Sequence, residues 1–115
     1  TTQEGEHLPV PHCIRGTAGW AIVEALRPFA DAAAAVIEKP TFGATALPAA
    51  LADYDAIEFV GLCTDICVIS NALLVKAFCP EKCISVDAAC CAGVTPESHT
   101  TALNAMRACQ IEVRG

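Results

Sequence analysis

Three short apolar runs in the second half of the chain have the length and composition of β-strands. They are Ala56 to Leu62 (AIEFVGL), Cys83 to Val86 and Gln110 to Val113. Two longer stretches with helical spacing of apolar residues lie between them, which is typical of strands and helices in alternation. The pattern predicts a parallel sheet with helical crossovers, hence an α/β sandwich.

The two helices of this half have recognisable starts. The first is expected from Thr64 to Phe78, with Thr64 and Asp65 as capping candidates at its N-terminus. The second is expected from Thr95 to Cys109, because Thr95-Pro96-Glu97 combines a capping residue with a proline in the first turn.

The first half of the chain has a weaker pattern. Residues 1–17 contain two glycines and two prolines with little periodicity, which predicts a loop. Trp20 to Phe29 has helical spacing, and Ala33 to Glu38 reads as a buried strand that the pair Lys39-Pro40 closes. Leu47 to Ala52 predicts a short helix.

Composition narrows the class of protein. A chain of 115 residues with 54% hydrophobic and 17% charged residues predicts a single globular domain over residues 1–115. The net charge of −6 argues against nucleic acid as a partner, since that affinity comes mainly from Lys and Arg. Charged residues interrupt every long apolar stretch, so we expect no membrane span. The eight cysteines accompany abundant Ala, Val, Ile and Leu, which favours core-forming, reduced thiols and a cytoplasmic location over a disulfide scaffold.

Two places directly after predicted strands are candidates for chemistry, because ligands of parallel sheets bind outside the carboxyl ends of the strands. One is Glu38-Lys39 and the other is the segment 61–68 (GLCTDICV). Cys67 would lie in the first turn of a helix, which stabilises a thiolate by about 0.3–1 kcal/mol. Ionising a thiol near neutral pH needs about 2 kcal/mol, so a cation such as Lys39 would be required as well. On spacing alone, a buried apolar Cys67 and a solvated Lys39 remain an equal alternative.

The string GLCTDICV resembles the nucleophile motif of the cysteine hydrolases that include nicotinamidases and isochorismatase-like enzymes. The resemblance implies that Cys67, and not Cys63, is the nucleophile. It also implies a cis peptide bond between Leu62 and Cys63, and an oxyanion hole formed by the backbone N–H groups of Cys63 and Cys67. The implied fold is a three-layer α/β sandwich with a mostly parallel sheet, here lacking the first strands.

Other segments follow the same family in order and spacing. Lys39 in VIEKPTFGAT matches the family's catalytic lysine, and Phe42 matches a position that lines the substrate pocket. Asp87 in VDAACCAG fits the end of the next strand, where we expect a structural role.

The resemblance also implies a residue that this chain lacks. The family's catalytic aspartate ends its first strand, upstream of Thr1, and the chain starts without a methionine. We therefore expect an N-terminally incomplete domain in which the strands before Lys39 and Cys67 are not neighbours, and a longer parent protein as the functional unit.

A metal site is a further implication. Pro11-His12-Cys13 resembles the nicotinamidase segment that supplies a metal-binding histidine, and Glu4 lies near a position where some relatives supply a carboxylate. Such ligands suit zinc, iron or manganese. The alternative is that both are ordinary loop residues, and His7 and His99 are expected to face solvent.

The expected reaction is amide hydrolysis, with nicotinamide giving nicotinate and ammonia, on a small-molecule substrate and in a homo-oligomer. Alternatives are a carbamoyl or ureido substrate, and a catalytically incomplete remnant that serves as a structural or partner subunit. A thiol-redox protein using Cys90-Cys91 or Cys63 with Cys67 is a third.

Overall fold

The computed structural model describes residues 3–115 and divides the chain into two compact units, Thr1–Thr41 and Phe42–Gly115. Each unit has its own arrangement of elements. None of the described helices is both long and apolar enough to cross a bilayer. The single domain that the sequence predicts stays a prediction.

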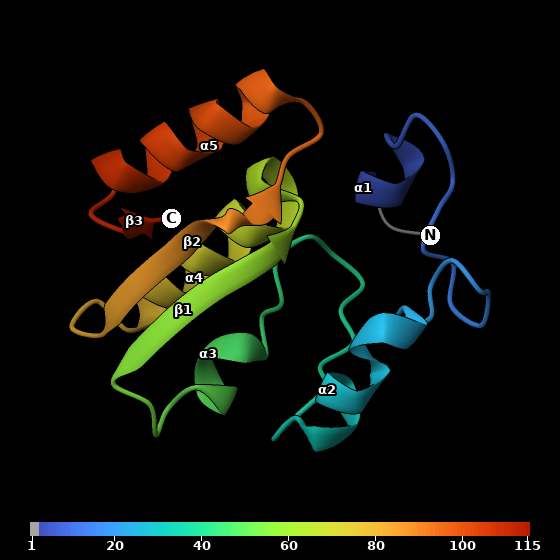
Figure 1. Cartoon of the computed structure of the whole chain (residues 1–115), viewed down its shortest axis with the longest axis horizontal. Coiled ribbons are helices and arrows are strands. Elements are labelled where there is room, and N and C mark those ends of the chain that lie inside the picture. The colour runs from blue at the N-terminus through green and yellow to red at the C-terminus, as the bar shows by residue number, and fades with distance from the viewer. Residues whose placement is uncertain (1–2) are drawn as a thin grey trace. The chain divides into compact units, whose positions relative to one another are not determined.

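The second unit is a parallel three-stranded sheet with connecting helices (Figure 1). The strands lie in the order β1-β2-β3, so each strand pairs with the next one along the chain. This confirms the predicted α/β class with a parallel sheet. The elements of the unit are α3 (Leu47–Ala50), β1 (Ala56–Leu62), η2 (Thr64–Val68), α4 (Ile69–Phe78), β2 (Cys83–Ala92), α5 (Pro96–Ala108) and β3 (Glu112–Arg114).

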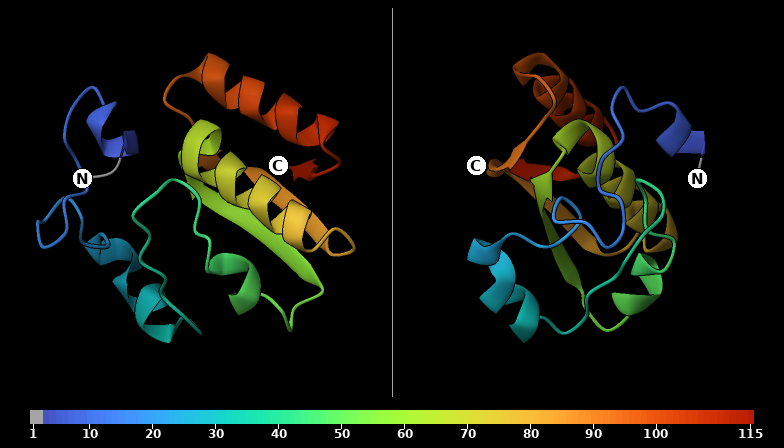
Figure 2. Two further views of the ribbon diagram at one scale, coloured as in Figure 1. Left: turned by 180° about the vertical axis from the view of Figure 1, so that it is seen from behind. Right: turned by 90° about the vertical axis from the view of Figure 1, so that its right-hand side faces the viewer.

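One face of this sheet forms the core. Alternate residues of β1 and β2 point to the same side, which is why Ile57, Ile84 and Val86 are all buried there. Seen from behind, α4 crosses in front of the strands with α5 beside it (Figure 2). The two helices add their apolar stripes to the same cluster, which includes Val68, Ala72, Val75, Leu103, Met106 and Ile111.

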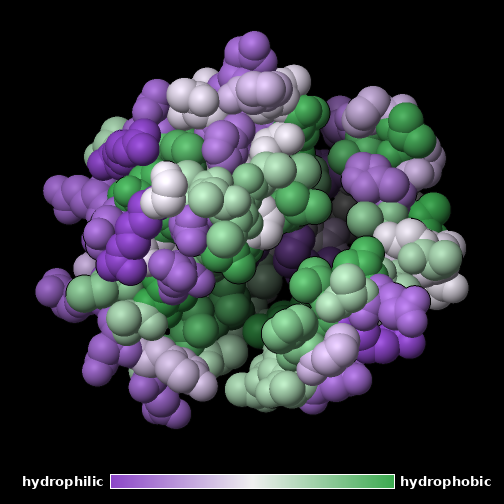
Figure 3. Space-filling view, in the orientation of Figure 1, coloured by the Kyte–Doolittle hydropathy of each residue, from purple (hydrophilic) through white to green (hydrophobic). Residues whose placement is uncertain are grey.

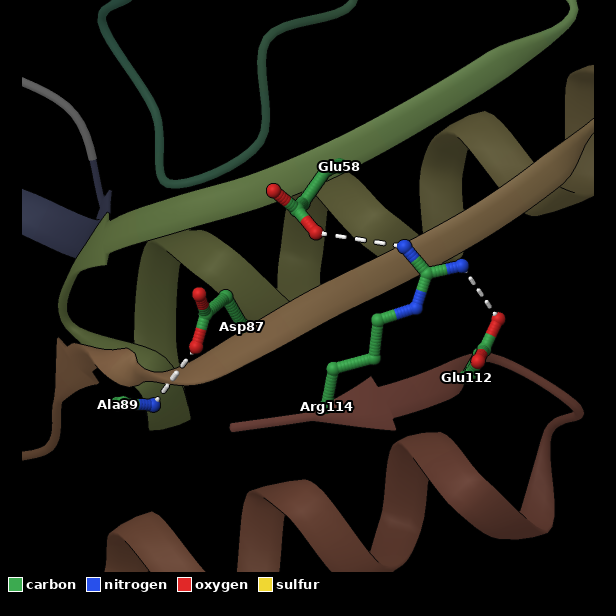
Figure 4. Close-up of polar contacts among 5 residues, drawn as sticks. All are labelled: Glu58, Asp87, Ala89, Glu112 and Arg114. Carbon is green, nitrogen blue, oxygen red and sulfur yellow. Dashed lines mark hydrogen bonds and ion pairs between the residues drawn. The ribbon is translucent and has the colours of Figure 1, made fainter.

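The opposite face of the sheet carries an exposed polar network. Arg114 on β3 donates to Glu112 at 2.8 Å and lies 3.6 Å from Glu58 on β1, while the Asp87 carboxylate on β2 accepts the Ala89 N–H at 3.0 Å (Figure 4). The last bond agrees with the structural role expected for Asp87. The space-filling view, which faces the same way as Figure 1, shows polar and apolar side chains intermixed (Figure 3).

Strand β2 is longer than the predicted Cys83 to Val86 because its pairing with β1 resumes after an irregularity. Phe59 pairs with Val86, and the next pairs are Gly61 with Cys91 and Leu62 with Ala92. Four residues of β2 therefore oppose a single residue of β1, which makes a large bulge. The alternation of polar and apolar residues in the sequence does not predict it.

The first unit differs from its predicted elements. It contains α1 (Gln3–Glu6), where a loop was expected, and a single turn η1 (Glu24–Leu26) followed by α2 (Arg27–Ala32). The helical spacing of Trp20 to Phe29 is realised only from Glu24 onward, in η1 and the start of α2. Pro28 lies in the first turn of α2, where its missing N–H costs nothing.

The strand predicted at residues 33–38 is also wrong. The segment forms no strand, and no other part of residues 3–41 forms a strand with which it could pair. Apolar character alone does not make a strand, since the backbone N–H and C=O groups need a neighbouring strand as partner.

Candidate active site

The candidate site begins where β1 ends. The peptide bond between Leu62 and Cys63 is cis, which confirms the prediction. Gly61 has a φ of 116°, a backbone conformation that residues with a Cβ rarely adopt, so a glycine is required immediately before the junction.

The turn after β1 is wider than an α-helix. Residues Thr64–Val68 form a π-helical turn, η2, and α4 continues from Ile69 to Phe78. The Cys63 carbonyl accepts the N–H groups of Ile66 at 3.1 Å and Val68 at 3.0 Å. The predicted helical span of 64–78 is thus confirmed, with a wide first turn of the kind often found at functional sites.

Cys67 lies in this π-turn, at the carboxyl edge of the sheet, and its side chain is half-buried. Its backbone carbonyl accepts a hydrogen bond from the side-chain amide of Asn71 at 2.9 Å. The same amide donates to the Phe42 carbonyl at 3.2 Å. The structure therefore places the backbone of the predicted pocket residue beside the turn that carries the predicted nucleophile.

The two capping candidates, Thr64 and Asp65, do not cap the helix. The fully buried Thr64 hydroxyl bonds to Nδ1 of His99 on α5 at 2.7 Å. His99 is consequently half-buried, and the prediction that it faces solvent is wrong. Gly93 makes this approach possible, because a Cβ there would lie 2.9 Å from the His99 backbone.

Asp65 forms a second tie to the same loop. Its carboxylate accepts the Val94 N–H at 3.1 Å. Partial burial acts to raise the pKa of Asp65, but hydrogen bonds from Ser98 and Val94, together with the nearby His99, hold the pKa below its ordinary value. The carboxylate is therefore stabilised in its charged form, and it locks the loop after β2 against the Cys67 turn.

Lys39 belongs to the first unit. Its ammonium donates to the Thr41 carbonyl at 3.1 Å, and the side chain lines a cavity of about 440 Å³. Arg15, which forms an ion pair with Glu38 and lies 6.0 Å from the ring centre of Trp20, lines the same cavity. That Lys39 serves Cys67 stays a prediction.

The metal candidates lie in the first unit as well. The exposed His12 donates from Nδ1 to the Val10 carbonyl at 2.8 Å, so its Nε2 keeps the lone pair that a metal would need. Glu4 lies in α1 and is half-buried. Within residues 3–115 no three His, Cys, Asp or Glu side chains are grouped as a metal site, so these residues alone do not fit a complete metal centre.

The remaining cysteines do not behave as expected. Cys13, Cys83, Cys90 and Cys109 are exposed, so the prediction that most cysteines belong to the core is wrong. A hydrogen bond with Asp87 and the charge of that carboxylate raise the pKa of Cys90, and burial raises the pKa of Cys91. A reactive redox thiol needs the opposite shift, which disfavours a redox pair at these positions.

The site thus lies on a parallel α/β sheet whose first βα junction carries a cysteine in a π-helical turn. Comparison with known families identifies the class of protein. The family model described as the isochorismatase domain matches residues 1–115, so the chain belongs to the isochorismatase family. No curated protein matches the chain in a sequence search.

Solved structures share this fold. A nicotinamidase/pyrazinamidase PncA from Bacillus subtilis is 28% identical, with a TM-score of 0.81, over 98% of this chain and 66% of its own. An isochorismatase family protein from Desulfovibrio vulgaris subsp. vulgaris str. Hildenborough is 26% identical, with a TM-score of 0.80, over 99% and 62%. The pyrazinamidase of Pyrococcus horikoshii in complex with zinc shares the fold at 19% identity and a TM-score of 0.67, over 89% and 60%. The chain thus spans about two thirds of the length of these proteins.

The sequence predicted no role for Asn71, and for Thr64 and His99 it predicted roles that differ from those in the structure. Asn71, Thr64 and His99 hold the Cys67 turn through side-chain bonds. Asn71 offered a signal, because it is a polar residue one turn after Cys67 in a stretch that is mostly apolar.

Proposed function

We propose that this chain carries the nucleophile of a cysteine-dependent amidohydrolase that acts on a small aromatic amide, with nicotinamide as the preferred substrate. The observation that supports the proposal is the position of Cys67 in the first turn after β1, at the carboxyl edge of a parallel sheet. The Bacillus subtilis nicotinamidase/pyrazinamidase, whose fold this chain shares, gives the substrate class.

The reaction would proceed through a covalent intermediate. The Cys67 thiolate attacks the amide carbonyl carbon, and the backbone N–H groups of Cys63 and Cys67 stabilise the oxyanion. The C–N bond breaks, ammonia leaves with the proton delivered by the aspartate that the family resemblance places upstream of Thr1, and the acyl group remains on sulfur as a thioester. Water then adds to the thioester carbon, and the thiolate leaves as the carboxylate product forms.

Lys39 is the proposed cation of this site, where it would favour the thiolate over the thiol. A helix terminus alone contributes about 0.3–1 kcal/mol, which is less than thiol ionisation near neutral pH requires. Phe42 would contribute to the pocket for the aromatic ring. A divalent metal bound partly by His12 stays a prediction, and none of these steps depends on it.

The decisive experiment measures ammonia and nicotinate release from nicotinamide by the protein that contains this chain. Replacing Cys67 by Ala should lower kcat/KM by about 10³-fold or more, because no other group can form the thioester. Cys109→Ala is the matched control, since Cys109 is an exposed cysteine at the far end of α5 and should leave the rate unchanged.

The outcomes separate the alternatives. Turnover that survives Cys67→Ala would refute the proposed nucleophile. Turnover of a carbamoyl or ureido compound in preference to nicotinamide would keep the chemistry and replace the substrate. A wild-type protein that hydrolyses none of these compounds would favour a non-catalytic subunit.

A further inference from the structure

Asn71 is a buried polar residue on α4, one helical turn after Cys67, with 9% of its surface exposed. Its side-chain hydrogen bonds reach two backbone segments, the turn before α4 in its own helix and residues 42–44. The amide nitrogen donates to the Cys67 carbonyl at 2.9 Å and to the Phe42 carbonyl at 3.2 Å, and Oδ1 accepts the Ala44 N–H at 2.7 Å. The three partners fix the orientation of the amide, because two are acceptors and one is a donor.

The segment that Asn71 holds runs along α4. A Cβ on Gly43 would lie 3.8 Å from the Leu74 side chain and 3.9 Å from Ser70, and Ala44 is buried at 6% exposure. The chain passes α4 here before it enters α3 (Figure 2). Residues 42–44 thus form a strap that lies against the helix, and two of its backbone groups, the Phe42 carbonyl and the Ala44 N–H, bond to the Asn71 side chain.

We propose that Asn71 is a positioning residue that sets the Cys67 turn and the Phe42 strap at a fixed separation, and thereby the distance between the attacking sulfur and the wall of the substrate pocket. This inference rests on the proposed function for its catalytic consequence. The Asn71 amide nitrogen bonds at once to the Cys67 carbonyl inside the π-turn and to the Phe42 carbonyl on the strap, so one side chain couples the two segments directly.

The chemistry of the amide is specific to this task. The three contacts of residue 71 require two N–H donors and one acceptor on one short side chain, and only asparagine has them at this length. Aspartate has the same shape and keeps the acceptor for Ala44, but when ionised it has no donor for the Cys67 and Phe42 carbonyls. Asn71→Asp therefore removes the two bonds that matter and retains the third.

The test compares Asn71→Asp with Asn104→Asp, an exposed asparagine on α5, in the full protein. Alkylation by iodoacetamide followed by mass spectrometry gives the rate at Cys67 relative to exposed Cys109 in the same molecule. We expect Asn71→Asp to lower this ratio about fivefold or more, and Asn104→Asp to leave it within twofold. The ratio should recover as the pH is lowered, because the protonated carboxyl regains one donor.

Nicotinamide hydrolysis is measured on the same variants. We expect a loss of about tenfold or more in Asn71→Asp, and recovery toward lower pH relative to wild type. Asn71→Ser, which can donate one hydrogen bond, should fall between wild type and Asn71→Asp in both measurements.

Two results would overturn the inference. One is an alkylation ratio in Asn71→Asp and Asn71→Ser equal to that of wild type. The other is a rise of both cysteine rates together in both variants, which would make Asn71 a residue of general folding. If the wild-type protein hydrolyses no amide while the alkylation ratio responds as expected, the positioning role stands and the proposed function fails.

Discussion

The two units of the chain contrast in how they hold their candidate chemistry. In Phe42–Gly115 a buried cluster from β1, β2, η2, α4 and α5, with Ile111 before β3, supports the turn that carries Cys67. In residues 3–41 no side chain is buried, and Phe29 is 73% exposed. The nucleophile candidate is therefore supported by a hydrophobic core, whereas Lys39, His12 and Glu4 lie in a segment without buried side chains. We expect stability to be concentrated in the second unit.

The largest expected difference between the two units is in the stability lost when a large apolar side chain is replaced by alanine. Met106→Ala should lower the free energy of unfolding by about 2–5 kcal/mol, because Met106 is fully buried between α5 and the sheet. Phe29→Ala removes a larger side chain from the exposed surface of α2 and should change the free energy of unfolding by less than about 0.5 kcal/mol. Urea unfolding of both variants checks the contrast, and equal losses would show that the first unit has a core as well.

A smaller effect is expected where Lys82 ties the start of β2 to the segment after α3. Its ammonium donates to the carbonyls of Leu51 at 2.9 Å, Ala52 at 2.8 Å and Tyr54 at 2.5 Å. Lys82→Met should cost about 1–3 kcal/mol in unfolding experiments, since the carbonyls lose a charged donor.

Lys76→Met is the matched control for this measurement. Lys76 is partly buried, but its ammonium makes only one long, exposed bond, at 3.5 Å, to the Pro80 carbonyl, so the loss of stability should be near zero. Equal effects of the two substitutions would mean that the three-carbonyl contact of Lys82 contributes nothing to the stability of the second unit.

The smallest expected effect is a pH dependence at the Asp65 tie. The pKa of Asp65 is lower in the folded protein than its ordinary value of about 3.9, so the unfolded chain binds the proton more tightly. The resulting stability is present above about pH 4 and is lost as the pH falls through the folded pKa.

Asp65→Asn tests this sign, because asparagine keeps an oxygen acceptor for the Val94 N–H but does not titrate. Unfolding curves from neutral pH down to about pH 3 should fall less steeply for the variant than for the wild type. Parallel curves would show that the carboxylate contributes no linked proton.

The predictions from sequence succeeded where local pattern and tertiary burial agree. The span of β1 was predicted residue for residue, and Thr95 caps α5 as expected, through a capping box with Ser98. In each case the signal lies within a few neighbouring residues. The apolar run at 33–38 carries a similar local signal but has no strand partner within residues 3–41, which no local pattern could reveal.

The candidate site divides in the same way. Cys67, Cys63 and the cis peptide came from a contiguous motif, and the structure confirms the cis bond and the helical turn that follows it. The partners of Thr64 and Asp65 lie about 30 residues further along, and those of Asn71 lie nearly as far back. Such ties between distant segments depend on the completed fold, so the roles assigned to these residues from sequence were wrong or missing.

The bulge in β2 has a consequence for how this chain tolerates change. Val86 pairs with Phe59 and Cys91 pairs with Gly61, while the four residues between them, 87–90, face one residue of β1. Of these four, Asp87 also pairs with Arg114 on β3. We expect single-residue insertions or deletions at residues 88–90, which have no pairing partner on β1 or β3, to be tolerated without shifting the pairs on either side. Strand β2 can change length at this point without moving the carboxyl end of β1, which carries the Cys67 turn. We therefore expect differences in length among related proteins to occur at this point of β2.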